Sequence, residues 1–302
     1  NMRINLNLLK FKETIIDLPF FLYRRKDISK INKYKKVYFL LQSYLIVFLF
    51  KRLDKNRFCR VMNLFFGGDG KLSYDKSVDL YIKNFNGGLI YYPNKYRISG
   101  SMVNHQFELD NLLHSYNLDN FDITSEDVII DCGANVGSLY MAIKKYEKNI
   151  TYIAFEPDPR VNLCLRLNLE GEENITINSF GLSDKNKKSS FYLGSEHGDS
   201  SLESFTTESI VEIETIKLDD FKYRKIKLLK IDAEGHEFEV LLGGYNTLKY
   251  IEYIAVDMGA EKGEGEENTV SEVTNFLLKN GFSIVDFNES RTTSLFKNNK
   301  LK

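Results

Sequence analysis

The sequence predicts an α/β protein with a doubly wound, seven-stranded, mostly parallel sheet, an antiparallel edge strand and a helical N-terminal extension. From residue 127 onward, short apolar runs alternate with stretches of helical periodicity, which is the pattern of right-handed βαβ units. The last two runs are joined by a short connection, so we expect them to pair antiparallel at one edge. Upstream, residues 2–66 are apolar and basic with little turn chemistry, which indicates helix.

The strands of the α/β part are expected where short runs are rich in apolar and β-branched residues, which suit a buried pleat. In chain order these runs are 127–131, 150–156, 174–180, 225–232, 251–258, 282–287 and 292–297. Apolar residues recur at helical spacing between them, which predicts helices at 138–148, 159–169, 236–244 and 269–280. Pro157 and Pro159 fix the direction of the chain before the second of these helices.

The chain is therefore expected to have three parts. Residues 2–66 form the helical N-terminal region. Residues 67–120 form a connecting region, in which "FFGGDGKLSYD" and "NFNGGLIYYPNKYR" predict a small β-hairpin and residues 103–118 recover helical spacing. Residues 121–302 form the α/β domain.

Within the N-terminal region, residues 37–50 form an apolar run between the basic stretches 33–36 and 51–52. The run is shorter than the roughly 18 apolar residues that a membrane span requires. One interpretation is a helix buried in a bundle or in the interface of a homo-oligomer. The other is a peripheral membrane helix, in which residues 33–52 contact anionic headgroups through their basic flanks. The sequence leaves both open.

The composition argues against several classes of protein. With 41 basic and 42 acidic residues, the formal net charge is −1, so no whole-molecule field favours nucleic acid as a partner. The three cysteines, Cys59, Cys132 and Cys164, form no CxxC pair, which argues against a zinc site and a disulfide framework. We therefore expect a reducing, cytoplasmic location, on the inner face of the membrane if the N-terminal helix binds lipid.

The loop "DCGANVG" (131–137), after the first strand of the domain, carries the main functional signal. Gly133 and Gly137 permit a sharp turn and close backbone approach, and the next helix N-terminus offers free N–H groups. No Lys follows Gly137, so a P-loop for a triphosphate is disfavoured. The carboxylate of Asp131 would repel a dinucleotide pyrophosphate. S-adenosylmethionine carries an ammonium and a sulfonium, so an acid at this position indicates such a cationic ligand.

A second acid, Glu156, ends the second strand, nineteen residues beyond Gly137. A carboxylate at this position can accept both hydroxyls of a ribose. NAD and S-adenosylmethionine both contain a ribose, so Glu156 alone does not separate them. The structural alternative for Asp131 is a turn or N-cap role.

These segments resemble the FkbM family of S-adenosylmethionine-dependent methyltransferases, within the class I Rossmann-like fold. The resemblance covers about residues 120–297 and rests on "VIIDCGANVGSLY", "AFEPDPRVNLCLRLNL", "GDSSLES", "IKLDDF" and "LLKIDAEGHEFEVLLG", in the family's order and spacing. Residues 1–100 match no family motif. The resemblance implies that residues 121–302 are a class I methyltransferase domain, with S-adenosylmethionine as cofactor and S-adenosylhomocysteine as product.

The resemblance also implies a set of cofactor contacts. Asp131 would hold the cationic side of S-adenosylmethionine, and Glu156 would hold its ribose. The other implied contacts are Gly133, Ala134, Asn135 and Gly137 at the methionine end, Pro157 and Asp158 beside the adenosine, Gly181, Leu182 and Ser183 beside the adenine, and Ser200 and Ser201 from the polar loop 196–204. Asp184 is a further candidate beside the adenine, with a turn role as its alternative.

The reaction centre is expected in "KIDAEGHE", after the fourth strand of the domain. Asp232 is the first choice for this centre, and Lys230 shares its face if the strand persists. Glu234 and His236 lie on the turn that follows, where His236 is either a base or a helix-cap residue. Asp257 ends the next strand, but two acids on different strands are weak grounds for a divalent metal, so none is expected.

The sequence thus predicts an O-methyltransferase that acts on a sugar hydroxyl of a surface polysaccharide, a glycolipid or another glycosylated product. One rival is an NAD-dependent sugar-modifying enzyme, which would need a GxGxxG loop that the sequence lacks. Another is a non-catalytic, membrane-associated assembly factor with a degenerate methyltransferase domain. The presence of Asp131, Gly133, Gly137, Glu156 and Asp232 argues against degeneration.

Overall fold

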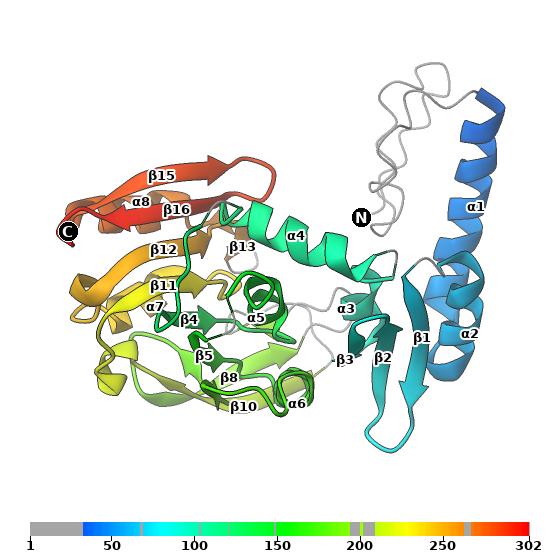
Figure 1. Ribbon diagram of the computed structural model, residues 1–302, viewed down its shortest axis with the longest axis horizontal. Coiled ribbons are helices and arrows are strands. Elements are labelled where there is room, and N and C mark those ends of the chain that lie inside the picture. Colours follow the sequence, from blue (N-terminus) through cyan, green and yellow to red (C-terminus); the bar gives the residue numbers. More distant parts are fainter. Residues whose placement is uncertain are drawn as a thin grey trace. The chain divides into compact units, whose positions relative to one another are not determined.

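The structure is a computed structural model that describes residues 33–66, 69–102, 104–119, 121–147, 149–193, 200–201, 209–262 and 267–301. The chain divides into two compact units, Asn1–His105 and Gln106–Lys302, which are taken in turn (Figure 1). The division falls inside the connecting region that was predicted at 67–120. The part of the predicted helical region before residue 33 lies outside the described residues.

The N-terminal unit begins with two helices, α1 (Lys33–Arg52) and α2 (Lys55–Phe65). An antiparallel sheet follows, with the described strands β1 (Gly70–Asp75), β2 (Leu80–Phe85) and β3 (Gly88–Tyr92), and then the short helix α3 (Lys95–Ser99). Asn86 and Gly87 form the two-residue turn of the predicted hairpin, and β1 adds a strand beside β2. Within the described residues, no helix has the length and apolar character needed to cross a membrane.

Aromatic and aliphatic side chains form the core of the N-terminal unit. The ring of Phe50 from α1 packs edge-on against Phe58 from α2, with centroids 5.3 Å apart, and Met62 and Leu80 are fully buried. Lys83 is also fully buried, and its ammonium lies 2.5 Å from a carboxylate oxygen of Asp69. The burial of this lysine is tolerated because its charge is paired.

Seven of the described strands form the main sheet of the C-terminal unit, in the order β15-β16-β12-β11-β4-β5-β6. They are β4 (Val128–Cys132), β5 (Thr151–Phe155), β6 (Ile175–Asn178), β11 (Ile226–Ile231), β12 (Ile251–Asp257), β15 (Phe282–Asn288) and β16 (Thr293–Asn298). Neighbours are parallel, except that β16 runs antiparallel to β12 and β15. The predicted doubly wound, mostly parallel sheet is confirmed. Its antiparallel strand lies second from the edge, because β15 pairs outside it.

The order of the strands reverses beside β4. From β4 the chain moves outward through β5 and β6, and it later returns to β11 on the other side of β4. In sheets of this kind, ligands bind beyond the carboxyl ends of the strands at the reversal. The loops that follow β4, β5 and β11 are therefore where a ligand is expected.

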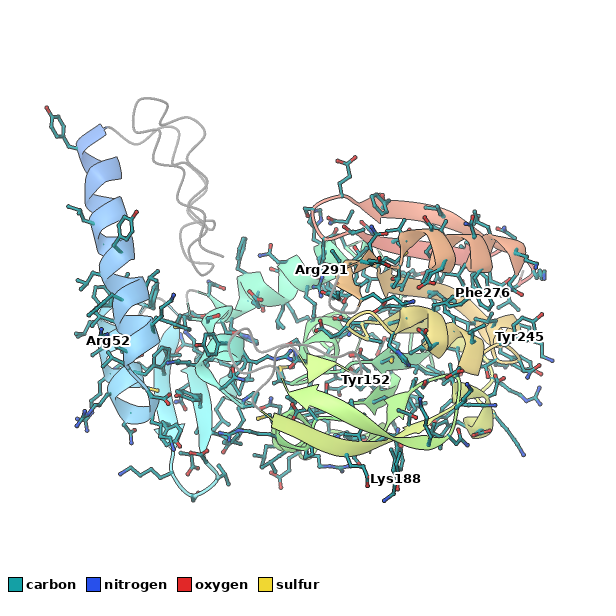
Figure 2. All side chains as sticks on the ribbon, turned by 180° about the vertical axis from the view of Figure 1, so that it is seen from behind. Arg52, Tyr152, Lys188, Tyr245, Phe276 and Arg291 are labelled. Atoms are coloured by element: carbon teal, nitrogen blue, oxygen red, sulfur yellow. The ribbon has the colours of Figure 1, made fainter. Side chains whose placement is uncertain are left out.

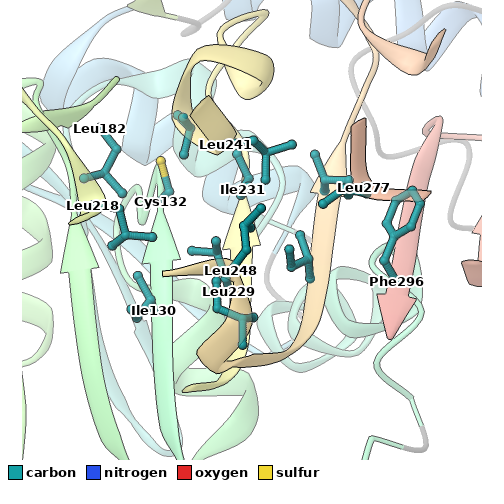
Figure 3. Close-up of a cluster of buried hydrophobic side chains, with 14 of the residues drawn as sticks. Ile130, Cys132, Leu182, Leu218, Leu229, Ile231, Leu241, Leu248, Leu277 and Phe296 are labelled. Atoms are coloured by element: carbon teal, nitrogen blue, oxygen red, sulfur yellow. The ribbon is translucent and has the colours of Figure 1, made fainter. Parts of the chain in front are cut away.

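Helices cover both faces of the main sheet (Figure 1). One face carries α4 (His105–Ser115), α5 (Ser138–Ile143) and α6 (Pro159–Asn168). The other face carries α7 (Glu237–Gly243), α8 (Val270–Lys279) and two short 3-10 turns (Leu218–Phe221 and Leu248–Tyr250). Figure 3 shows the core on this second face, where strand residues meet the helices through Ile130, Cys132, Leu229, Ile231, Leu241 and Leu277.

A second, smaller sheet was not predicted. Its described strands pair in the order β7-β10-β8-β9, which are β7 (Gly181–Leu182), β10 (Ser209–Ile216), β8 (Lys187–Leu193) and β9 (Ser200–Ser201). The prediction of a polar loop at 196–204 is wrong for Ser200 and Ser201, because their backbones pair with β8. Two further short strands, β13 (Ala260–Lys262) and β14 (Glu267–Asn268), pair with each other. The helix predicted at 138–148 ends earlier, at Ile143.

Gly243, at the end of α7, offers a test of the packing in this unit. A methyl group there would lie 1.9 Å from the backbone oxygen of Ser183, which cannot move aside. Alanine favours the helix by about 1 kcal/mol, but overpacking of this kind costs about 1–3 kcal/mol or more. We expect Gly243→Ala to lower the free energy of unfolding by about 1–2 kcal/mol and Tm by several degrees in a thermal melt.

Leu242→Ala, at an exposed position of the same helix, provides the control and should change stability by less than about 1 kcal/mol. Equal stabilities of wild type and Gly243→Ala would contradict the close contact between α7 and Ser183.

Candidate active site

The loop between β4 and α5 is shaped by residues with positive φ. Gly133 (φ 74°), Asn135 (φ 51°) and Gly137 (φ 89°) lie in the left-handed region, which glycine adopts without strain. A Cβ atom on Gly133 would lie 1.9 Å from the carbonyl oxygen of Asp232. The glycine therefore allows the loop after β4 to touch the residue that follows β11.

Hydrogen bonds fix this loop against the end of β5. The backbone N–H groups of Gly133 and Ala134 both donate to the carbonyl of Phe155, at 3.0 Å. The side-chain oxygen of Asn135 is buried and has no hydrogen-bond partner among the described residues. A buried acceptor is costly unless a donor reaches it, so this oxygen marks a position suited to a donor from a bound molecule.

Glu156 follows β5, and only 7% of its surface is exposed. Its Oε2 accepts a hydrogen bond from the N–H of Asn135 (2.9 Å), and its Oε1 accepts one from the N–H of Asp158 (3.0 Å). Asp158 in turn caps α6 by accepting from the N–H groups of Arg160 and Val161. The carboxylate of Glu156 thus joins the glycine loop to the start of α6.

Asp131 lies on β4 with 1% of its surface exposed. Its carboxylate accepts a hydrogen bond from the hydroxyl of Tyr152, and its Oδ1 lies 3.1 Å from Nζ of Lys230. Lys230 stands opposite Asp131 in the register of β11 and β4. Asp131 suggested a cationic ligand, but the structure places a cation of the chain itself, Lys230, beside it. A direct contact between Asp131 and a cofactor stays a prediction.

Lys230 joins the glycine loop to both strands beside the reversal. Its ammonium donates to the carbonyls of Gly133 (2.7 Å) and Cys132 (3.3 Å) and lies 3.5 Å from Oδ2 of Asp232. Burial lowers the pKa of Lys230, but the negative charges of Asp131 and Asp232 raise it more, so the net shift is upward. Lys230 is therefore a fixed cation and not a proton acceptor.

Asp232 is surrounded by donors from distant parts of the unit. Its Oδ2 accepts from the hydroxyl of Tyr116 (2.7 Å), which follows α4, and from Nη2 of Arg291 (3.2 Å), which lies between β15 and β16 (Figure 2). Burial, with the charge of Asp232, raises the pKa of Tyr116 well above 10, so the phenol stays protonated and donates. Oδ2 of Asp232 is thus engaged by these partners.

Arg291 also binds the acid at the end of β12. Its Nε donates to Oδ2 of Asp257 at 2.6 Å, and the N–H of Gly259 donates to Oδ1 at 3.1 Å. The guanidinium therefore bridges Asp232 and Asp257. These are the two acids for which the sequence offers only weak grounds for a divalent metal. In the part of the chain that the structure describes, no group of three or more His, Cys, Asp or Glu residues could hold a metal ion.

Glu261, on β13, is an acid that the sequence analysis did not single out. Its Oε2 is buried and lacks a hydrogen-bond partner among the residues described. A Cβ atom on Gly259 would lie 3.3 Å from Oδ1 of Asp257 and 3.6 Å from Oε1 of Glu261, so the two carboxyl groups border the same small space. Burial raises the pKa of Glu261 to about 8, and the charges of Asp232, Asp257 and Glu237 add to this effect. Near neutral pH it can therefore exist in either protonation state.

The turn between β11 and α7 is held by Glu237. This side chain is 1% exposed and accepts hydrogen bonds from the N–H groups of Ala233 (3.1 Å) and Gly235 (3.0 Å) and from the hydroxyl of Thr269 (3.0 Å). Burial raises the pKa of Glu237 to about 7 despite these donors. Its geometry is that of a residue that shapes the turn.

His236 and Glu234 lie on the same turn. His236 occupies the N-cap position of α7, which is the helix-cap alternative, and its Nε2 lies 3.0 Å from the hydroxyl of Ser183. Its Nδ1 lies 3.7 Å from a carboxylate oxygen of Glu239, and its side chain is 13% exposed. Glu234 is half-buried and has a φ of 51°. The imidazole is therefore engaged within the protein.

The segment predicted beside the adenine borders the end of β5. Gly181 and Leu182 form β7, and a Cβ atom on Gly181 would lie 3.8 Å from Cβ of Pro157. Ser183 is 1% exposed. The structure thus brings together the glycine loop and the segments at 156–158, 181–183 and 230–237. Ser201 lies on β9, but its side chain is outside the described part of the structure.

Comparisons with known proteins identify the family. The family described as "Methyltransferase FkbM domain" matches residues 131–284, about half of the chain. This match contains the glycine loop, Glu156, Asp232 and Glu261.

Two relatives each match a little less than half of the chain. The hexuronic acid methyltransferase AglP of Haloferax volcanii is 31% identical over 140 residues, which cover 45% of this chain and 57% of that protein. The 2-O-methyltransferase NoeI of Sinorhizobium fredii is 25% identical over 150 residues, which cover 43% of this chain and 62% of that protein. The chain therefore spans less than two thirds of the length of either relative.

Among solved structures, an FkbM methyltransferase from Methylobacillus flagellatus aligns with a TM-score of 0.44 and 15% identity, over 68% of this chain and 55% of that one. The order of the strands, the loop after β4 and the family match agree with one another. The chain belongs to the FkbM family of methyltransferases.

Proposed function

We propose that this methyltransferase transfers a methyl group from S-adenosylmethionine to a hydroxyl of a saccharide. The observation that carries the proposal is Glu156, a buried carboxylate that is hydrogen-bonded to the glycine loop beside the strand reversal. The two relatives, named as a hexuronic acid methyltransferase and a 2-O-methyltransferase, support a sugar acceptor. Such an acceptor belongs to a polysaccharide, a glycolipid or another glycosylated product.

The residues around the loop fit S-adenosylmethionine. The buried oxygen of Asn135 suits the α-ammonium of the methionine end, and Gly133 and Gly137 leave the backbone accessible there. Glu156 suits the ribose hydroxyls, because it is a buried carboxylate that follows β5 and is held against the glycine loop. Pro157, Asp158 and residues 181–183 border the side assigned to the adenosine.

When bound, S-adenosylmethionine supplies an electrophilic methyl group on a sulfonium centre. The chain contributes negative charge at this edge of the sheet, through Asp131, Asp232 and Asp257, and only part of it is offset by Lys230 and Arg291. This balance suits a cationic cofactor and disfavours the pyrophosphate of NAD. The NAD-dependent alternative is therefore less favoured. The family match disfavours the non-catalytic assembly factor.

The same negative charge also affects which kind of sugar can bind as the methyl acceptor. A uronic acid would bring another carboxylate next to Asp257, whereas a neutral sugar would not. We therefore propose a neutral sugar hydroxyl as the acceptor, in contrast to the substrate class named for the Haloferax relative.

Transfer to a hydroxyl also requires a proton acceptor. Asp232 was the first choice for the reaction centre, but its Oδ2 accepts hydrogen bonds from Tyr116 and Arg291. Lys230 holds its proton, and the ring of His236 contacts Ser183. We propose Glu261 for this role, because its buried Oε2 lacks a described partner and its raised pKa of about 8 matches a base that works near neutrality.

Assembly and location are secondary parts of the proposal. We propose a homo-oligomer in the cytoplasm, with no nucleic acid partner. A monomer in light scattering of the purified chain would contradict the homo-oligomer. Recovery of the protein from another compartment in cell fractionation would contradict the cytoplasmic location.

The first test concerns cofactor binding. Calorimetric titration of the purified chain should show binding of S-adenosylmethionine and no binding of NAD. Glu156→Ala removes a charged acceptor for the ribose, and hydrogen bonds to charged groups contribute about 1.5–3 kcal/mol, so Kd should rise at least about tenfold.

Glu172→Ala is the matched control, because this half-buried carboxylate bonds Tyr140 and Lys144 away from the loop. It should bind S-adenosylmethionine with wild-type affinity. Binding of NAD, or of neither molecule, would sink the proposed cofactor.

The second test concerns the proton acceptor. Methyl-labelled S-adenosylmethionine is incubated with nitrophenyl glycosides of neutral hexoses and of hexuronic acids, and labelled product is counted. With the best acceptor, kcat should rise as pH rises through about 8, because only deprotonated Glu261 accepts a proton. Glu261→Gln should lower kcat by about 10²–10⁴ and abolish this rise.

Glutamine resembles the protonated acid, so Glu261→Gln should bind S-adenosylmethionine normally at pH 7, and Glu261→Asp should recover part of the rate. Glu272→Gln, on α8, is the control and should keep the wild-type pH profile. A fully active Glu261→Gln would exclude Glu261 as the base, and a preference for hexuronides would exclude the neutral acceptor.

A further inference from the structure

The net charge of the whole chain is near zero because its two units carry large, opposite charges. The N-terminal unit, Asn1–His105, contains 20 Lys and Arg against 7 Asp and Glu, a formal charge of +13. The C-terminal unit, Gln106–Lys302, contains 21 Lys and Arg against 35 Asp and Glu, a formal charge of −14. A surface that binds the N-terminal unit by charge is therefore negative.

The few acids of residues 33–105 do little to offset the basic side chains around them. They are four aspartates, and each already has a polar partner within the unit, namely Asp54 with Tyr81, Asp69 with Lys83, Asp75 with Ser77 and Asp79 with Lys55. The exposed basic side chains include Lys51, Arg52, Lys55, Arg57, Arg60, Lys71 and Lys76. The excess positive charge thus lies at the surface of the unit.

An apolar stripe lies on α1 beside part of this charge. Its members follow the spacing of one helix face and are exposed by 66%, 42%, 50% and 53%, for Leu41, Tyr44, Leu45 and Phe48 respectively. The opposite face of α1 is buried in the core of the unit through Ile46, Val47 and Phe50. The stripe is therefore a solvent-facing surface of a helix that is already packed on its other side.

The end of the stripe combines both properties. Arg52, one turn beyond Phe48, places its guanidinium 5.0 Å from the centre of the Phe48 ring (Figure 2). Tyr34, two turns before Leu41, is 86% exposed on the same helical face. Aromatic residues and arginine at the margins of an apolar face are typical of helices that lie in the headgroup region of a bilayer.

We propose that the N-terminal unit docks on an anionic phospholipid surface, with the stripe Leu41, Tyr44, Leu45 and Phe48 buried among the lipids and the basic side chains against the headgroups. Charge alone would also suit a nucleic acid, but a row of exposed apolar side chains has no role on phosphates and favours lipid. The C-terminal unit, at −14, is repelled by such a surface, so docking belongs to the N-terminal unit. The inference does not depend on the methyl-transfer reaction.

The experiment is flotation of the full chain with vesicles of phosphatidylcholine alone or with about 30% phosphatidylglycerol, at low and high salt. We expect binding to the anionic vesicles, weakened by salt. Leu45→Ser/Phe48→Ser should lower the partition coefficient at least about tenfold. Lys51→Gln/Arg52→Gln should also weaken binding and should reduce its dependence on salt.

Leu278→Ser/Val285→Ser is the matched control, because these side chains of the C-terminal unit are exposed by 47% and 53%. This pair should float like the wild type, and circular dichroism with thermal melting should show that every variant remains folded. Both measurements are independent of catalysis, so failure here leaves the proposed reaction untouched.

Several outcomes would overturn the proposal. Wild-type chain that stays in solution with both kinds of vesicle would exclude docking, and equal binding to neutral and anionic vesicles would exclude the role of charge. A dimer in light scattering that Leu45→Ser/Phe48→Ser dissociates, without vesicle binding, would assign the stripe to a second copy. Tight binding of short RNA or DNA, unaffected by the serine pair and without flotation, would assign the unit to nucleic acid.

Discussion

The candidate site depends on one buried cation, Lys230. Its ammonium contacts the carboxylates of Asp131 and Asp232 and the carbonyl of Gly133, and so joins the two strands on either side of the reversal to the glycine loop. Its removal would leave Asp131 as a buried charge without its ionic partner, which typically costs about 3–5 kcal/mol. The chain can therefore concentrate acids at this edge of the sheet because a fixed cation holds two of them in place.

Arg291 binds the carboxylates of Asp232 and Asp257, just as Lys230 binds those of Asp131 and Asp232. The acids with such ionic partners are held in defined positions. Glu261 differs, because its Oε2 is buried without a described hydrogen-bond partner and because burial, with the added effect of nearby carboxylates, raises its pKa to about 8. The paired acids Asp232 and Asp257 thus contribute indirectly, because their charge adds to the effect of burial on the pKa of Glu261.

The sequence predicted what short-range patterns determine, and missed what long-range packing determines. Strands, their mostly parallel pairing, the glycine loop and Glu156 follow from apolar runs and from residues next to them. Tyr116 and Arg291 lie 116 and 59 residues from Asp232, and no local pattern links them to it. Glu261 precedes an acidic run in which one side chain cannot be singled out. From the sequence, the cation beside Asp131 was expected to belong to a ligand. The strand register that brings Lys230 opposite Asp131 appears only in the fold.

The charge distribution connects the site to the N-terminal unit. A domain that concentrates carboxylates for a cationic cofactor is repelled by anionic lipid at distances below the Debye length, about 8 Å at physiological ionic strength. If its acceptor is attached to such a lipid, the repulsion must be offset by charge elsewhere on the same chain. The basic N-terminal unit, which also has an exposed apolar helix face, supplies such charge. The opposite charges of the two units are therefore what the proposed docking requires of a chain whose catalytic domain is acidic.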